Sequence, residues 1–223
     1  MTLNESADLI EEGAASIQLA ERPTRPATLT TETFDVIVIG GGQAGLSVGH
    51  HLKRAGAHFV ILDENARIGD SWRKRWDSLR LFTPAKFDAL DGMPFPARGN
   101  YFPTKDEMAN YLEAYARRFQ LPVRNHSRVE RLFRRGSRFV ARAGKCEYEA
   151  DQVVVAMAKY QQPKVPSFAV ALSPEIVQLH SHEYRNTGQL RPGGVVLVGG
   201  GNSGADIARE AAHARPAIET VRR

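Results

Sequence analysis

Three glycines directly follow the apolar run "FDVIVI": Gly40, Gly42 and Gly45 stand at G-x-G-x-x-G spacing in "GGGQAGLS". Where a strand turns into a helix, the first glycine permits a tight turn, the second lets backbone approach a phosphate, and the third lets the helix pack on the strand. The first N–H groups of that helix, beginning at Gln43 and Ala44, then point at the bound anion. The spacing therefore predicts a cradle for a pyrophosphate group.

A carboxylate at the expected distance makes this prediction more specific. The run "HFVIL" supplies a second strand and is followed by Asp63, which lies 23 positions after Gly40. In dinucleotide-binding units, an acid roughly 20 residues after the first glycine accepts hydrogen bonds from a ribose. Strand, glycines, helix, strand and acid thus predict a Rossmann-like unit that holds a dinucleotide.

The same pattern returns near the end of the chain. After the apolar run "GVVLV", Gly199, Gly201 and Gly204 repeat the glycine spacing, and Asn202 and Ser203 lie at the start of the helix expected there. Two such units in one chain predict two dinucleotides, one held permanently and one exchanged. This arrangement fits a flavin that takes hydride from a nicotinamide.

The position of the second unit that corresponds to Asp63 is basic. Arg222 follows Gly199 by 23 positions, with Arg223 beside it. An acid at this place favours the free ribose hydroxyls of NAD, whereas a guanidinium favours the 2′-phosphate of NADP. The second unit is therefore predicted to bind NADP.

The segment after the first unit is rich in tryptophan and arginine. Residues 66–96 are long and irregular, which in a compact domain is typical of a functional segment. We expect Trp72 and Trp76 to wall a ring system and Arg73, Arg75 or Arg80 to lie near a phosphate or carboxylate. Core tryptophans with surface arginines are the alternative.

Regular elements are expected between this segment and the second cradle. A helix is predicted over residues 102–120, with Thr104 and Glu107 in capping-box positions. Residues 121–150 have the alternation of short strands in a meander or hairpin. Residues 151–158 indicate a buried parallel strand that returns to the first sheet.

Composition and motifs exclude several other classes of protein. The 223 residues carry 30 Lys and Arg against 25 Asp and Glu. The basic residues of 128–145 alternate with apolar ones, which indicates a solvated sheet face rather than a nucleic-acid site. His180 and His182 lack a surrounding cluster of Cys or acids, so no metal site is predicted. No nucleophile elbow of G-x-S-x-G type is predicted, because the match at residues 45–49 lies inside the helix expected after the first cradle and not at a strand-to-helix turn; this argues against hydrolysis by acyl transfer.

The sequence also bears on location. No run approaches the roughly 18 apolar residues of a membrane span, and residues 1–33 lack the pattern of a secretory signal. The single cysteine, Cys146, excludes an internal disulfide and a Cys-x-x-Cys pair. A reducing compartment, the cytoplasm, is therefore expected.

The two cradles and the motifs between them resemble the flavin-containing monooxygenase family, particularly its bacterial members. Baeyer–Villiger monooxygenases and the plant auxin-synthesis monooxygenases form the wider circle. The resemblance spans about residues 34–214 and keeps the family's order. It is carried by "GGGQAGLS", "IGDSWRKRWDSLRLFTP", "YQQPKVP", "LHSHEYRN" and "VGGGNSGADIA".

The resemblance implies FAD and NADPH as cofactors, with O2 and a small molecule as substrates. Hydride would pass from NADPH to FAD, O2 would be captured as a flavin hydroperoxide, and a nitrogen, a sulfur or a ketone would be oxygenated. The family's histidine signature would fall on His180, and no catalytic residue is assigned. The implied FAD site comprises Gly40, Gly42, Gln43, Ala44, Gly45, Asp63, Trp72 and Arg73, and the implied NADPH site comprises Gly199, Gly201, Asn202, Ser203, Gly204 and Arg222.

The predicted fold class is α/β, with two Rossmann-like, three-layer ββα units of which the second is incomplete. We expect a flexible leader at 1–33, the first part of an FAD domain at 34–160 and the start of an NADP domain at 161–223. Relatives continue beyond this point, so the chain has the pattern of a truncated product. Ala158 departs from the family, because glycine usually lets backbone approach the nucleotide there.

Two other functions stay open at this stage. One is a two-dinucleotide flavin reductase without oxygenation; its disulfide-reducing branch is disfavoured by the missing Cys-x-x-Cys pair. The other is a non-catalytic, nucleotide-binding fragment. Assembly into a homo-oligomer is also open.

Overall fold

The structure, a computed structural model, describes residues 29–158, 162–214 and 218–221. Arg222 and most of the expected leader, 1–33, lie outside the described residues. Strand β1 begins at Thr30, so the last four residues of the expected leader belong to the sheet. The reason is pairing, because Thr30 to Phe34 lie in parallel register beside β6.

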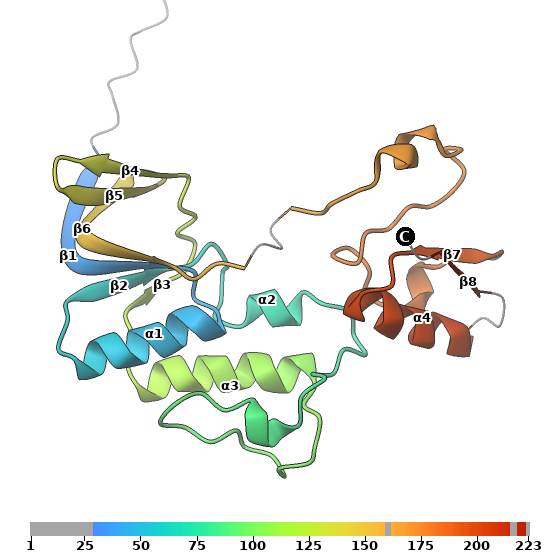
Figure 1. The fold of residues 1–223 in the computed structure, drawn as a ribbon, viewed down its shortest axis with the longest axis horizontal. Helices are drawn as coiled ribbons and strands as arrows, with labels where there is room; N and C mark the ends of the chain where they lie inside the picture. Colours follow the sequence, from blue (N-terminus) through green and yellow to red (C-terminus); the bar gives the residue numbers. More distant parts are fainter. Residues whose placement is uncertain (1–28, 159–161, 215–217, 222–223) are drawn as a thin grey trace, which may run out of the picture.

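A six-stranded sheet forms the main body, in the order β3-β2-β1-β6-β5-β4 (Figure 1). Strand β1 pairs in parallel with β2 on one side and with β6 on the other, whereas β5 and β4 continue the sheet antiparallel. The predicted α/β class is confirmed. The strands are β1 (Thr30–Ile39), β2 (Phe59–Leu62), β3 (Val123–Arg124), β4 (Arg131–Arg135), β5 (Arg138–Ala143) and β6 (Cys146–Val155).

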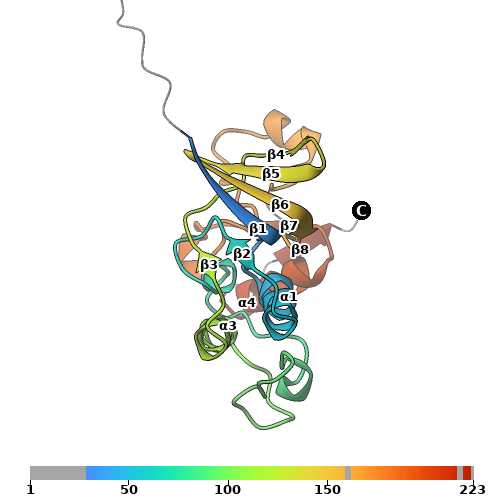
Figure 2. The same cartoon turned by 90° about the vertical axis from the view of Figure 1, so that its left-hand side faces the viewer.

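Helices cover one face of this sheet. Helix α1 (Gln43–Arg54) and helix α3 (Lys105–Arg118) lie side by side below it, and the short helix α2 (Asp70–Arg73) precedes α3 (Figures 1 and 2). Alternate residues of the strands, such as Val38 and Ile61, are fully buried against these helices. This alternation is what a sheet with one face on a helical layer requires.

On the other face of the sheet, residues of β1 and β2 pack against residues of the antiparallel strands β5 and β6, which belong to the meander. Ile37 and Val60 point to this side and join Tyr148 and Ala150 in a second buried cluster. Helices, parallel strands and meander thus form three layers. The core of the molecule lies on both faces of β1.

Two strand predictions need correction. Residues 123–124 pair with β2 at the far edge of the sheet, so the meander consists of β4, β5 and the first half of β6 alone. The returning strand was expected to be buried, yet Val155 is 60% exposed. Val155 alternates onto the face opposite the helices, beyond the part of that face where the second cluster packs.

The second unit is a strand–helix–strand segment. Strand β7 (Val195–Val198) pairs in parallel with β8 (Ile218–Val221), and helix α4 (Asn202–Ala214) connects them. Irregular chain with short 3-10 helices at Ser167–Ala171 and Thr187–Gln189 leads into it. A third 3-10 helix, Ala85–Phe87, lies in the first unit.

The capping box predicted for α3 is confirmed. The Thr104 side chain accepts from the Glu107 N–H, and the Glu107 carboxylate accepts from the Thr104 N–H at 2.8 Å. We expect Thr104→Ala to lower the free energy of unfolding by about 1 kcal/mol. The Glu107 N–H would lose its acceptor, and the reciprocal hydrogen bond from the backbone N–H of residue 104 to the Glu107 carboxylate would be less well ordered. Thr104→Ser keeps the hydroxyl and should stay close to the parent. Urea denaturation measures both, and an alanine variant as stable as the parent would contradict the assignment.

Stability should also fall at acidic pH. Hydrogen bonds from Arg124 lower the pKa of Glu32 below its ordinary 4.5, and those from Arg67 do the same for Glu113. Such carboxylates stabilise the fold above the unfolded pKa, and the contribution is lost as pH falls through the lowered value. We expect steady stability near neutral pH and a decline below about pH 4.5. Glu113→Gln should flatten this decline in urea titrations at stepped pH; stability that rises on acidification would refute the expectation.

Candidate functional site

The first glycine turn lies where three parallel strands end. Ile39 pairs with Leu62 and with Val155, so the residues that follow these strands meet at one edge of the sheet. In open α/β sheets, ligands bind at this carboxyl edge. The chain therefore brings Gly40 and Asp63 together at the predicted place.

Each glycine of the first turn has a different surrounding. Gly40 has φ +107°, and a Cβ there would lie 2.9 Å from the Ala156 carbonyl oxygen. A Cβ on Gly45 would lie 1.8 Å from the Gly40 carbonyl oxygen, so only glycine lets α1 approach the turn. A Cβ on Gly42 would have nothing within 4 Å. The open space at the second glycine is the place predicted for a phosphate.

The start of α1 suits an anion electrostatically. Gly42 is the N-cap and offers no side chain to the first N–H groups, which belong to Gln43, Ala44 and Gly45. The first turn has no acidic residue, and the last turn carries His51, Lys53 and Arg54. The positive end of the helix dipole is therefore uncompensated by the chain itself. These residues fit a pyrophosphate group.

Asp63 is held at the rim of this cradle. Its Oδ2 accepts from the Gly41 N–H at 2.6 Å, and its Oδ1 accepts from the N–H and the Nδ2 of Asn65 at 2.8 and 2.9 Å. A carboxylate has about four acceptor positions. Asp63 is thus fixed in orientation and keeps capacity for ribose hydroxyls.

Asn65 is a contributor that the sequence analysis missed. It lies two residues after Asp63, at the spacing of an Asx turn, which was the available signal. Its two hydrogen bonds hold one carboxylate oxygen while Gly41 holds the other.

The tryptophan-rich segment, residues 66–96, does not have the arrangement in which Trp72 and Trp76 wall a ring system. Trp76 is 4% exposed inside the main core cluster, and Trp72 packs partly buried against that cluster. The Arg73 guanidinium donates to the Ile68 carbonyl, to Asn110 and to Glu113 at 2.6, 3.1 and 3.1 Å. These contacts favour the alternative, a structural role in fastening α2 to α3.

The second glycine turn repeats the geometry of the first. Gly199 has φ +110°, a Cβ on Gly204 would lie 2.2 Å from the Gly199 carbonyl oxygen, and a Cβ on Gly201 would have nothing within 4 Å. Asn202 and Ser203 begin α4, as expected. The same steric pattern therefore leaves the same open space at the second glycine.

The two units touch through a seam formed by the loop after α2. The Ser78 hydroxyl donates to Glu210 at 2.5 Å, and the Asn186 amide donates to Asp77 at 2.7 Å. Ile207 of α4 is buried in the main core cluster, and Tyr184 is 3% exposed beside it. Both cradles therefore belong to one connected body.

Other sequence expectations can be placed briefly. The His182 N–H donates to Nδ1 of His180 at 3.1 Å, which is a local turn. Within the described ranges, no group of three His, Cys, Asp or Glu residues could hold a metal ion. None of the helices in the described part of the chain has the length and apolar character needed to cross a membrane.

Comparison with known proteins decides the family. Residues 37–223 match the pyridine nucleotide-disulphide oxidoreductase family. The chain belongs to this family. A flavin-containing monooxygenase from Stenotrophomonas maltophilia has a similar structure, with a TM-score of 0.78 and 35% identity over 86% of this chain and 57% of that one.

Curated relatives of this chain support the same family. An uncharacterized CzcO-like oxidoreductase from Geobacillus kaustophilus is 45% identical over 187 residues, which are 84% of this chain and 54% of that protein. The probable indole-3-pyruvate monooxygenase YUCCA3 of Arabidopsis thaliana is 31% identical over 183 residues, 77% of this chain and 42% of that protein. The chain spans about half the length of the relatives it matches. The resemblance to flavin-containing monooxygenases is confirmed.

The geometry of the first glycine turn yields a prediction for a pair of variants. Gly45→Ala should destabilise the fold by several kcal/mol, roughly 2–4, because the methyl group would overlap the Gly40 carbonyl and force α1 off the turn. Gly42→Val should unfold at nearly the parent temperature, because Gly42 has an extended conformation and open space. Thermal unfolding of both variants measures this contrast. Equal loss of stability in the two would mean that the Gly42 space is needed by the fold itself.

Proposed function

We propose that this chain binds FAD on the Gly40 turn and NADP on the Gly199 turn, as part of a flavin-dependent monooxygenase. The observation that carries the proposal is the repeated open space at Gly42 and Gly201, each of which directly precedes the first residue of a helix. The monooxygenases among the similar proteins support it, and OTEMO, a protein of similar fold, is described in complex with FAD and NADP. FAD would accept hydride and activate O2.

The chain's own residues would bind and orient the two cofactors. The first N–H groups of α1 would hold the FAD pyrophosphate, and Asp63 would accept from its ribose, since Gly41 and Asn65 keep the carboxylate in place. The start of α4 would hold the NADP pyrophosphate. Arg222, outside the described residues, would pair with the 2′-phosphate and select NADPH over NADH.

The domain assignment follows from this division of cofactors. Residues 34–160 form the first part of the FAD domain and residues 161–223 the start of the NADP domain. The oxygenated substrate is a small molecule whose nitrogen, sulfur or ketone is attacked. No residue of the described chain is assigned a proton transfer.

A flavin reductase without oxygenation is the second candidate. It is favoured by the family match itself, whose description names disulphide oxidoreductases. With Cys146 as the single cysteine, this chain contains no dithiol of its own. In such a reductase the electrons would pass from the flavin to a separate acceptor molecule and not to a dithiol of this chain.

A visible spectrum of the purified chain tests the proposal. We expect a flavin spectrum that bleaches when NADPH is added without oxygen. Gly42→Val should abolish flavin binding, whereas Gly201→Val should retain flavin and bleach more slowly, because its methyl groups obstruct only the second cradle. NADH in place of NADPH measures the preference assigned to Arg222.

The outcomes separate the candidates. Bleaching followed by product formation on admission of air supports a monooxygenase, and bleaching with acceptor reduction but no oxygenation supports the reductase. A protein that stays colourless after incubation with FAD would refute the proposal for this chain. Full flavin content in Gly42→Val would show that the first cradle is wrongly assigned.

A further inference from the structure

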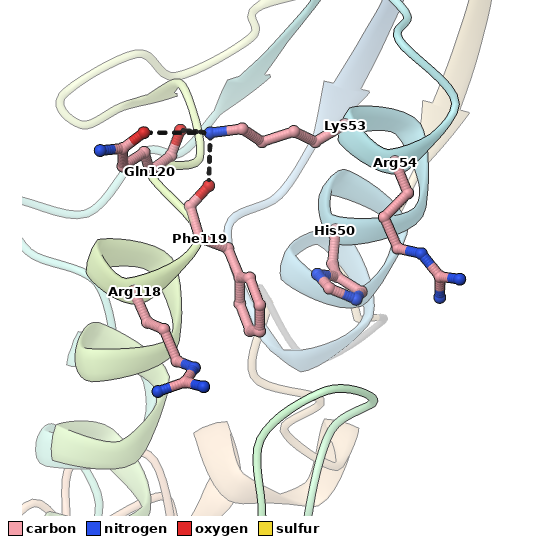
Figure 3. A pocket seen from close by; sticks show the side chains of 6 residues that line it. All are labelled: His50, Lys53, Arg54, Arg118, Phe119 and Gln120. Atoms are coloured by element: carbon pink, nitrogen blue, oxygen red, sulfur yellow. Dashed lines mark hydrogen bonds between the residues drawn. The ribbon is translucent and has the colours of Figure 1, made fainter.

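We propose that a pocket between the C-terminal ends of α1 and α3 binds a phosphate group, carried by a soluble molecule or by a lipid. The pocket has a volume of about 300 Å³, and none of its lining residues belongs to a glycine turn. Figure 3 shows the side chains that line it. Helix α1 has 12 residues and is about 18 Å long, and the Gly42 cradle lies at its other end. The lining residues are His50, Lys53, Arg54, Arg118, Phe119 and Gln120.

Two arginines line the pocket with most of their donors unused. Arg54 makes one long contact, from Nη1 to Oδ2 of Asp91 at 3.4 Å. Arg118 lies over the Phe119 ring at 5.7 Å and, within the described part of the chain, has no hydrogen-bonded or ion-paired partner. Guanidinium groups bind phosphate through two parallel hydrogen bonds, which makes arginine suited to this ligand.

The buried imidazole of His50 is the second observation. His50 is 6% exposed, with its ring 4.2 Å from that of Phe119. The nearest carboxylate oxygen, on Asp91, lies 3.9 Å from its Nε2, beyond hydrogen-bond distance, and no other described residue supplies a partner. Its ring nitrogens are not among the fully enclosed side-chain atoms that lack a partner in the described part of the chain, so they remain accessible to a ligand. A phosphate oxygen in the pocket would give the imidazole a hydrogen-bond partner.

The charges around the pocket leave a positive excess. The C-terminal end of a helix carries a partial negative charge. At the end of α3 the Lys53 ammonium offsets this charge, because it donates to the carbonyls of Phe119 and Gln120 at 2.7 and 3.2 Å. Asp91 is the carboxylate at the rim, in contact with His50, His51 and Arg54. One carboxylate thus faces two guanidiniums, so a dianion is the matching ligand.

Inorganic phosphate is the probe for this site. The background for every measurement is a Gly42→Val, Gly201→Val chain, in which both cradles are obstructed as alternative phosphate sites. Binding is followed by 31P line width and by the rise in unfolding temperature, with chloride at equal ionic strength as reference. The result is thereby independent of whether the chain binds FAD.

Arg118→Gln and Arg131→Gln form a matched pair of variants. Arg131 is exposed on β4 and also lies over a phenylalanine ring, that of Phe133 at 5.1 Å. We expect Arg118→Gln, and likewise Arg54→Gln, to weaken phosphate binding about tenfold through loss of a charge-assisted hydrogen bond. Arg131→Gln should bind as the parent does. Circular dichroism checks that all variants fold.

Three results are decisive. The proposal is overturned if the Gly42→Val, Gly201→Val chain binds no phosphate, or if adding Arg118→Gln to that chain leaves phosphate binding unchanged. Binding of free phosphate that depends on Arg118, without sedimentation on phosphatidic acid vesicles, identifies a soluble ligand. Sedimentation on those vesicles that Arg118→Gln abolishes supports the same site with a lipid headgroup as the source of the phosphate.

Discussion

The structure depends on one close approach, that of helix α1 to the turn at Gly40. No side chain larger than hydrogen fits at Gly45, because a Cβ there would overlap the Gly40 carbonyl oxygen. This contact fixes the direction in which α1 leaves the sheet and puts its first N–H groups at the carboxyl edge. It also places Gly41 within hydrogen-bond distance of Asp63. The second unit repeats the contact at Gly204 and Gly199, so one steric rule builds both cradles.

The position of α1 has consequences at its other end. Its last turn meets the end of α3, where His50 packs against Phe119 and Lys53 holds the carbonyls of residues 119 and 120 (Figure 3). The same helix therefore has a bare positive start in the cradle and a cationic side-chain cluster 12 residues later. Two regions suited to anions arise on one element for different reasons, the backbone dipole at one end and side chains at the other.

How far the sequence predicts this structure depends on the range of the interaction concerned. The glycine turns and the Thr104 capping box rest on sterics and hydrogen bonds between near neighbours, and Asp63 lies at the fixed offset of a strand–helix–strand unit, 22 residues after the Gly41 N–H that it accepts from; the structure contains them as expected. The packing of Trp76 and the partners of Arg73 depend on how α2 meets α3, some 40 residues later in the chain for Glu113. No local pattern encodes such contacts. The cationic pocket was unforeseen for the same reason, because its two walls come from different helices.

The seam between the units shows why the tryptophan segment is conspicuous in the sequence yet absent from the cradles. The loop after α2 carries Asp77 and Ser78 to the second unit, while Trp76 anchors that loop in the core of the first. The proposed hydride transfer between two dinucleotides would demand a defined distance between their cradles, and an anchored loop that touches both units would supply it. The hydrogen bonds at the seam join exposed side chains and contribute about 1 kcal/mol each. Burial of Ile207 and Tyr184 therefore provides most of the free energy that holds the two units together.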